Sequence, residues 1–158
     1  MIISTMHRLV FISILFWGLT FIPQTLSAQS YSESELQEMY LSYLKSQGMD
    51  GSVDSDGDVQ FTYEDRTYFI EVSEDDPNFF RVVLFNFWPI ESHQESVQVA
   101  FACNEVNNQM KVAKAYMAND NTWMACELFV DRPDHFKAVF MRCLKVIDDG
   151  VDIFVEEM

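Results

Sequence analysis

The sequence FFRVVLFNFW occupies residues 79–88, and Pro89 follows it. Its apolar residues fall on both parities, as the neighbours Val82 and Val83 illustrate. A strand that is apolar on both sides is covered on both faces of its sheet. We therefore expect a strand packed by helices on one face and by further chain or a second subunit on the other. Pro89 has no amide hydrogen to donate, so the strand should end there.

Two shorter strands precede this stretch. Apolar and polar residues alternate over 59–63 and again over 68–72, which is the pattern of strands with one buried face. Residues 64–66 separate the two and predict a hairpin turn.

A helix is expected before these strands. Ser32 and Glu35 stand three residues apart and predict a capping box, in which each side chain binds a free amide at the helix start. Apolar residues recur at helical spacing from Leu36 to Leu44. Gly48 suits the left-handed residue that closes a helix.

Further elements are expected after Pro89. In order, they are a helix from residue 91 or 92 to about 108, a strand over 110–117, a turn at 119–121, a strand over 124–130, and a helix that starts near 131–134, runs over 136–147 and continues weakly to 154. The whole order is helix, three strands, helix, two strands, helix. It predicts an α+β fold, α-β-β-β-α-β-β-α, with a mainly antiparallel sheet packed by helices.

Several stretches carry a resemblance to a known family. They are DGDVQF at 56–61 with RTYFI at 66–70, NFWPI at 86–90, and NEVN at 104–107 with KVAK at 111–114. Together with the element order, they resemble the YbjN-like family, which shares its fold with type III secretion chaperones, over about residues 34–150. The resemblance implies a noncatalytic, often dimeric domain. A signal peptide departs from cytosolic secretion chaperones.

The N-terminal residues have the pattern of a secretory signal peptide. Arg8 precedes an apolar run over residues 9–22, which covers 14 positions, and Pro23 ends it. A helix needs about 20 apolar residues to cross a bilayer, so the run is short for an anchor. Small residues around Ala28 suit a signal peptidase. We expect cleavage after residue 28, a single domain at 29–158, and export to the periplasm or the outside. An uncleaved anchor is the alternative.

The charge restricts the partners. The chain carries 25 Asp and Glu against 10 Lys and Arg, a net charge of −15. Residues 1–28 contain one of these basic residues and none of the acidic ones, so the mature charge is −16. Such a surface repels phosphate backbones and anionic lipids, so neither nucleic acid nor a membrane is an expected partner after cleavage. Basic peptides or divalent cations are attracted, unless the charge serves solubility alone.

The three cysteines are Cys103, Cys126 and Cys143. After export they would meet an oxidising compartment, where at most one internal disulfide and one free thiol can form. Each also falls within an apolar pattern, and free cysteine is among the most buried residue types. We expect core thiols, with a disulfide as the alternative.

No residue set predicts catalysis, a metal or a cofactor. Asp54, Asp56 and Asp58 alternate around Gly57, but an EF-hand counted from that glycine lacks its first and twelfth ligands. We therefore expect an acidic turn that leads into a strand. His93 and His135 are each expected at a helix start as solvated or capping residues. The acidic residues 74–76 are expected to form a solvated turn.

The aromatic residues suggest a contact surface. Six aromatic residues exceed what one face of a small core easily covers: Phe79, Phe80, Phe85, Phe87, Trp88 and Trp123. All of them except Phe80 are taken as the candidate binding or dimer surface. Aromatic side chains left exposed on the second face would mark a binding or dimer surface. The alternative is that helix one and the C-terminal segment cover that face.

Three functions follow from these observations. The leading one is an exported, noncatalytic protein-binding module that forms a homodimer. The second is a hydrolase whose catalytic carboxylates lie in the acidic loops. The third is a domain that senses a small molecule or a cation.

Overall fold

The computed structural model describes residues 31–158, so the predicted signal peptide at residues 1–28 lies outside the described residues. The elements, in chain order, are α1 (Glu33–Ser46), β1 (Gly51–Val53), β2 (Val59–Tyr63), β3 (Arg66–Ile70), β4 (Phe79–Pro89), α2 (His93–Gln109), β5 (Ala113–Ala118), β6 (Asn121–Phe129), the 3-10 helix η1 (Pro133–Ala138) and α3 (Phe140–Glu157). None of the helices in this range is long and apolar enough to cross a membrane.

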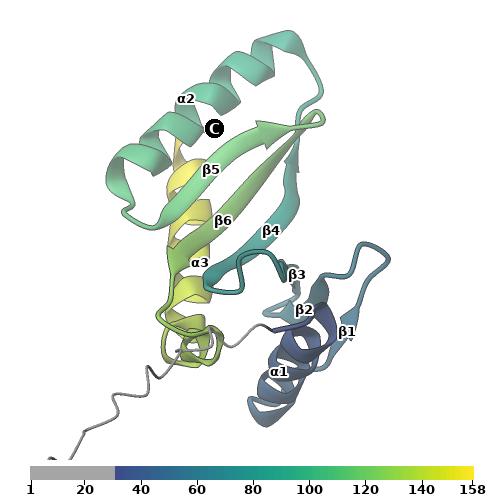
Figure 1. Ribbon diagram of the computed structural model, residues 1–158. Coiled ribbons are helices and arrows are strands. Elements are labelled where there is room, and N and C mark those ends of the chain that lie inside the picture. The colour runs from purple at the N-terminus through teal and green to yellow at the C-terminus, as the bar shows by residue number, and fades with distance from the viewer. Residues whose placement is uncertain (1–30) are drawn as a thin grey trace, which may run out of the picture.

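The strands form one six-stranded sheet in the order β1-β2-β3-β4-β6-β5 (Figure 1). Every neighbouring pair is antiparallel. The predicted α+β class with an antiparallel sheet is therefore confirmed, and the long strand β4 lies inside the sheet as expected. The likeness to the secretion-chaperone fold stays a prediction.

The sequence analysis missed the short edge strand β1. All three of its residues are exposed, so no alternation of apolar and polar side chains marks it. Gly51 lets the strand pass close to α1, since a Cβ there would lie 2.9 Å from the Leu44 side chain. Contact with α1, and not a pattern of hydrophobic residues, therefore determines the position of β1.

Turns and helix ends form as the local sequence predicts. Ser32 and Glu35 complete the capping box of α1, and Gly48 follows the helix with φ +78°. Glu64 and Asp65 have φ of 47° and 61°, which makes the two-residue hairpin turn between β2 and β3. Asp is among the residues that tolerate this left-handed backbone in hairpin turns.

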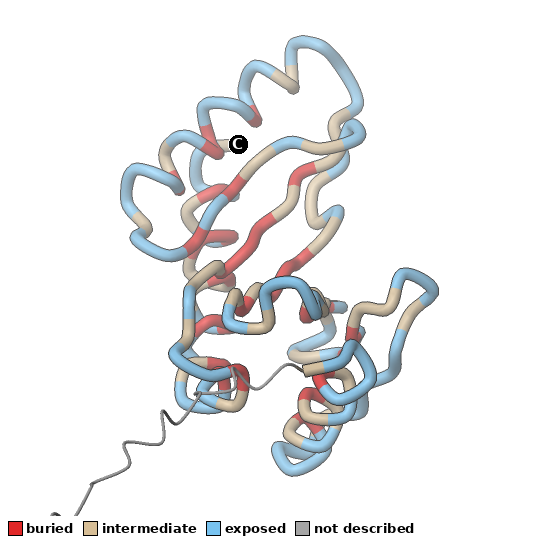
Figure 2. Tube along the Cα trace, viewed as in Figure 1, coloured by how far each residue is buried: buried red, intermediate tan, exposed pale blue. Residues whose placement is uncertain are grey.

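All three helices pack on one face of the sheet. Figure 1 shows α3 running along the back of β5 and β6, and α1 beside β1 and β2. Buried positions alternate along β2, whereas the middle of β4 and of β6 is buried without a break (Figure 2). The core joins Val59, Phe61, Tyr68, Ile70, Phe80, Val82, Leu84, Ala115, Met124 and Cys126 of the strands to Leu36, Tyr40 and Leu44 of α1, Val99, Ala102 and Val106 of α2, and Phe140, Leu144, Ile147 and Phe154 of α3.

The structure differs from the prediction at two boundaries. Met110 caps α2 instead of opening a strand, and β5 begins at Ala113. Helical turns begin at Pro133, within the predicted start at 131–134, but they form the 3-10 helix η1, and α3 itself starts at Phe140. The error at Met110 arises because its apolar side chain packs against the core from a helix end as it would from a strand.

Candidate binding surfaces

The second face of the sheet carries no helix of the described chain, and we call it the open face. Its residues include Thr67 and Phe69 of β3, Glu71 just after β3, Phe79, Arg81, Val83 and Phe85 of β4, Lys114 and Tyr116 of β5, and Trp123, Ala125, Glu127 and Phe129 of β6. The side chains on this face shield one another from solvent. Val83 and Ala125 are fully buried although they lie outside the helix-packed core.

An ion-pair network occupies the centre of the open face. Arg81 donates to Glu71 and to Tyr116, and its Nε lies 2.9 Å from a carboxylate oxygen of Glu127. Lys114 lies 3.5 Å from the other oxygen of Glu127. The guanidinium is therefore satisfied by Tyr116 of β5, Glu127 of β6 and Glu71, which follows β3. This network links the strands, and it engages the Arg81 guanidinium in contacts within the sheet.

An aromatic cluster lies beside the network. The rings of Phe69 and Phe85 have centroids 4.9 Å apart, and those of Phe85 and Trp123 are 4.4 Å apart at 65°. Trp123 also contacts Tyr116 at 5.7 Å. The indole Nε1 of Trp123 donates to the side-chain oxygen of Asn86 at 2.9 Å. These bonds and contacts fix the indole on the open face.

The five aromatic residues that were predicted to form one surface lie in different places in the structure. Phe85 and Trp123 lie together on the open face. Phe79 lies at the far end of the same face, against Phe129 at 5.3 Å. Phe87 and Trp88 instead contact Phe154 of α3, with centroids 5.1 and 5.6 Å apart. They pack against the core from the helix side, and Trp88 donates to Glu95 at 3.1 Å.

A β-bulge causes this separation. The pairing of β4 with β6 shifts between Leu84 and Trp88, and Asn86 within it has φ +51°. A bulge places one extra residue in a strand and so changes which face the next side chains meet. The sequence signal for it is the single Asn within the apolar run.

A hollow of about 430 Å³ joins the aromatic cluster to the loop between β1 and β2. Its lining residues are Asp54, Asp56, Asp58, Thr67, Phe69, Phe85, Asn86 and Trp123. Three aspartates and three aromatic residues thus line one hollow. The sequence analysis considered the aspartates and the rings separately, because only the folded sheet brings residue 54 near residue 123.

The aspartates form a turn, as expected. One carboxylate oxygen of Asp54 accepts the amides of Asp56 and Asp58, at 2.9 and 3.0 Å. One oxygen of Asp58 accepts the amide of Val72 at 2.9 Å. Burial, together with the charges of Asp54 and Asp56, raises the pKa of Asp58 above its ordinary value. Within residues 31–158, no three His, Cys, Asp or Glu side chains are grouped to hold a metal ion.

A second apolar surface lies on α2 and was missed from the sequence. Phe101 is 72% exposed, Val97 48% and Met117 of β5 44%. With Ala100, they line a shallow hollow of about 620 Å³. We call these four residues the α2 patch. The signal was present as apolar residues on the side of α2 opposite Val99.

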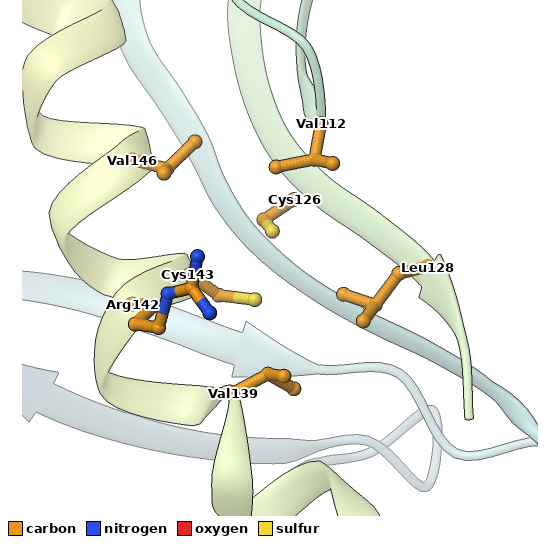
Figure 3. A pocket seen from close by; sticks show the side chains of 7 residues that line it. All are labelled: Val112, Cys126, Leu128, Val139, Arg142, Cys143 and Val146. Atoms are coloured by element: carbon orange, nitrogen blue, oxygen red, sulfur yellow. The ribbon is translucent and has the colours of Figure 1, made fainter. Parts of the chain in front are cut away.

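The cysteines are buried free thiols in the described structure. Cys126 and Cys143 line an apolar hollow of about 190 Å³ between β6 and α3, with Arg142 at its edge (Figure 3). Burial raises the pKa of Cys103 to about 11. A hydrogen bond to Cys126, together with burial, raises the pKa of Cys143. Cys103 and Cys143, whose thiols resist ionisation, are therefore poor nucleophiles and poor metal ligands.

The histidines and the acidic loop before β4 lie apart from one another. His93 is the first residue of α2 and lines a shallow hollow with Asp120. His135 lies in η1. Ser73 caps a turn by accepting the amide of Asp76 at 3.3 Å. Within the described residues, the structure does not place either histidine beside these groups.

The described residues form an α+β domain built on one antiparallel sheet. The YbjN family, described as "Putative bacterial sensory transduction regulator", matches residues 38–149. The match covers more than half of the chain, so the chain belongs to the YbjN family. This is not a known enzyme family. Neither a curated protein nor a solved structure matches the chain.

Proposed function

We propose that this protein is an exported, noncatalytic protein-binding module that acts as a homodimer. The observation that carries the proposal is that apolar side chains lie exposed on the α2 patch, and that half-buried aromatic rings and the exposed Phe129 lie on the open face, which no helix of residues 31–158 covers. Contiguous exposed apolar surface is typical of a site that contacts another protein. The regulator description of the family agrees with a binding role.

The α2 patch is the surface that suits self-association. Two copies with a net charge of −15 each repel one another, so they meet best where the surface carries little charge. The helix His93–Gln109 contains Glu95 and Glu105 but no Lys or Arg, and the apolar α2 patch lies on it. A two-fold contact between identical patches would bury Phe101 of both copies.

Light scattering of the purified protein tests the dimer. We expect a dimer that Phe101→Glu converts to a monomer, because the change places two carboxylates at the two-fold contact. Phe129→Glu is the matched control, since Phe129 is 74% exposed on the open face. A monomer at high concentration, or equal effects of both changes, would refute the α2 patch as the dimer surface.

Export rests on residues 1–28. We expect the native protein to begin at Gln29, in the periplasmic or extracellular fraction of its host. Intact mass measurement of protein from each fraction tests this. A native chain that retains residue 1 would refute cleavage.

A hydrolase is the second candidate, since the raised pKa of Asp58 in a hollow is a feature of catalytic carboxyls. Asp54 and Asp58 both hold backbone amides, however, and this explains their positions without catalysis. Turnover of any ester or glycoside that Asp58→Asn abolishes would favour the hydrolase over the binding module.

A further inference from the structure

The hollow on the open face has two chemically different walls. Asp54, Asp56 and Asp58 line it, and we call them the acidic wall; Phe69, Phe85 and Trp123 also line it, and we call them the aromatic wall. None of the described residues that line it is a Lys or an Arg. We propose that this hollow binds the basic side chain, Lys or Arg, of a partner polypeptide that docks on the open face. The proposal rests on the proposed binding function and specifies the chemistry of its partner.

The aromatic wall is organised before a ligand arrives. Phe69, Phe85 and Trp123 contact one another in sequence, with centroids 4.9 and 4.4 Å apart. The bond from Trp123 to Asn86, at the bulge of β4, holds the indole in place. A cation over the face of such a ring is attracted by its electron-rich surface, and Trp is the strongest of the aromatic side chains in this respect. Little ordering is therefore needed on binding.

The acidic wall carries charge that forms no salt bridge within the described residues. Asp54 and Asp58 each use one carboxylate oxygen for backbone amides. None of the ion pairs found within residues 31–158 involves Asp54, Asp56 or Asp58. The nearby guanidinium of Arg81 is already engaged by Glu71 and Glu127. A cation supplied by a partner would complete this wall.

A basic side chain fits the two walls better than other ligands do. An apolar ligand would leave the carboxylates unpaired. An anion would meet three negative charges in the hollow and a chain of net charge −15. The alkyl stem of Lys or Arg covers apolar surface while its charged end reaches polar groups. The two walls together therefore favour a ligand that has a positively charged end on an apolar stem, as Lys and Arg side chains do.

Nuclear magnetic resonance provides the test, with the indole N–H of Trp123 as reporter. Trp88 donates its own indole N–H to Glu95 on the helix side and serves as the internal control. The probes are the capped peptides acetyl-Gly-Lys-Gly-amide and acetyl-Gly-Arg-Gly-amide, with a norleucine peptide as the uncharged counterpart. We expect both basic peptides to shift the Trp123 signal saturably, at least about tenfold more tightly than the norleucine peptide, and to leave Trp88 in place.

Variants localise the effect. Asp54→Asn and Asp58→Asn should each weaken the binding of the basic peptides by about threefold or more. Glu105→Gln, which removes one charge from α2, should change their affinity little. Trp123→Leu should weaken them further, and its folding is checked by the unchanged Trp88 signal. Equal binding of lysine and norleucine peptides, or equal losses in Asp58→Asn and Glu105→Gln, would overturn the proposal.

The two measurements distinguish a failure of the basic-ligand proposal from a failure of the proposed binding function. If the basic peptides fail to shift Trp123 but light scattering still finds a dimer that Phe101→Glu dissociates, the basic-ligand proposal is refuted and the binding module stands. If both measurements fail, neither proposal survives.

Discussion

Asp148 of α3 accepts a hydrogen bond of 2.8 Å from the hydroxyl of Tyr68, a fully buried residue of β3 that is 80 positions away in sequence. The same oxygen lies 2.7 Å from the guanidinium of Arg66. This carboxylate therefore joins the helix layer to the sheet at the hairpin of β2 and β3. It also satisfies the hydroxyl of a side chain that is otherwise surrounded by the core.

Removing the acceptor should cost more than removing the donor. Asp148→Ala leaves the Tyr68 hydroxyl without its partner, and we expect a loss of about 1–3 kcal/mol of unfolding free energy. Tyr68→Phe leaves Asp148 paired with Arg66, so we expect a loss of about 1 kcal/mol of unfolding free energy. Urea unfolding measures both. Lys145→Ala is the control, since its ion pair with Asp149 is exposed and should contribute nothing measurable. A larger loss in Tyr68→Phe would contradict this account.

Asp58 should make stability fall as pH rises. Its folded pKa lies above the ordinary 3.8, so the folded protein binds the extra proton between the two values. Stability then decreases with rising pH through that window, and the cost is fully present above the folded pKa. Asn keeps an acceptor for Val72 and has no charge. We expect Asp58→Asn to stabilise the protein at pH 7 and to lose that advantage below the ordinary carboxyl pKa. Thermal unfolding at several pH values checks this, and a gain independent of pH would contradict it.

Gly150 of α3 should accept only the smallest side chain. A Cβ there would lie 3.1 Å from the sulfur of Met124, which is buried beneath the helix. Gly150→Ala combines a helix-propensity gain of about 1 kcal/mol with this close contact, so a net effect near zero is expected. Gly150→Leu overfills the interface and should cost about 1–3 kcal/mol or more. Denaturant titration compares the two, and equal stabilities would show that the helix can move off the sheet.

The capping box should contribute measurably to α1. Ser32 accepts the amide of Glu35, and the Glu35 carboxylate accepts the amide of Ser32. Ser32→Ala removes the first of these bonds and should cost about 1 kcal/mol. Ser42→Ala, in the exposed middle of the same helix, should cause no loss. Helical circular dichroism during thermal unfolding measures both changes, and equal behaviour would contradict a role for the cap.

The cysteines should resist modification in the folded protein. All three are buried, and the raised pKa of Cys103 and of Cys143 keeps these thiols protonated at pH 7. Because the thiolate is the reactive form, a disulfide reagent should label them only after unfolding. Counting labelled thiols before and after denaturation tests this. One thiol after unfolding, instead of three, would show a disulfide in the native protein.

Much of the fold is predictable because its determinants are local. The capping box at Ser32, the hairpin at Glu64 and Asp65, and the alternation along β2 each depend on residues within a few positions of one another. The apolar run of β4 likewise predicts an interior strand from its own composition. Such signals do not need the rest of the chain.

The candidate surfaces are different, because they depend on which elements meet. The sequence indicates exposed aromatic residues but does not show that the bulge at Asn86 sends Phe87 and Trp88 to α3 while Trp123 stays on the open face. Nor does it show that Asp54 and Trp123 line one hollow. The sequence alone determined the order of the three α-helices and of the strands other than β1, and the buried face of strands such as β2, since side-chain periodicity and backbone preference are local properties. Only the tertiary structure decided where charge and aromatic rings converge, because that depends on strand order and register across the whole sheet.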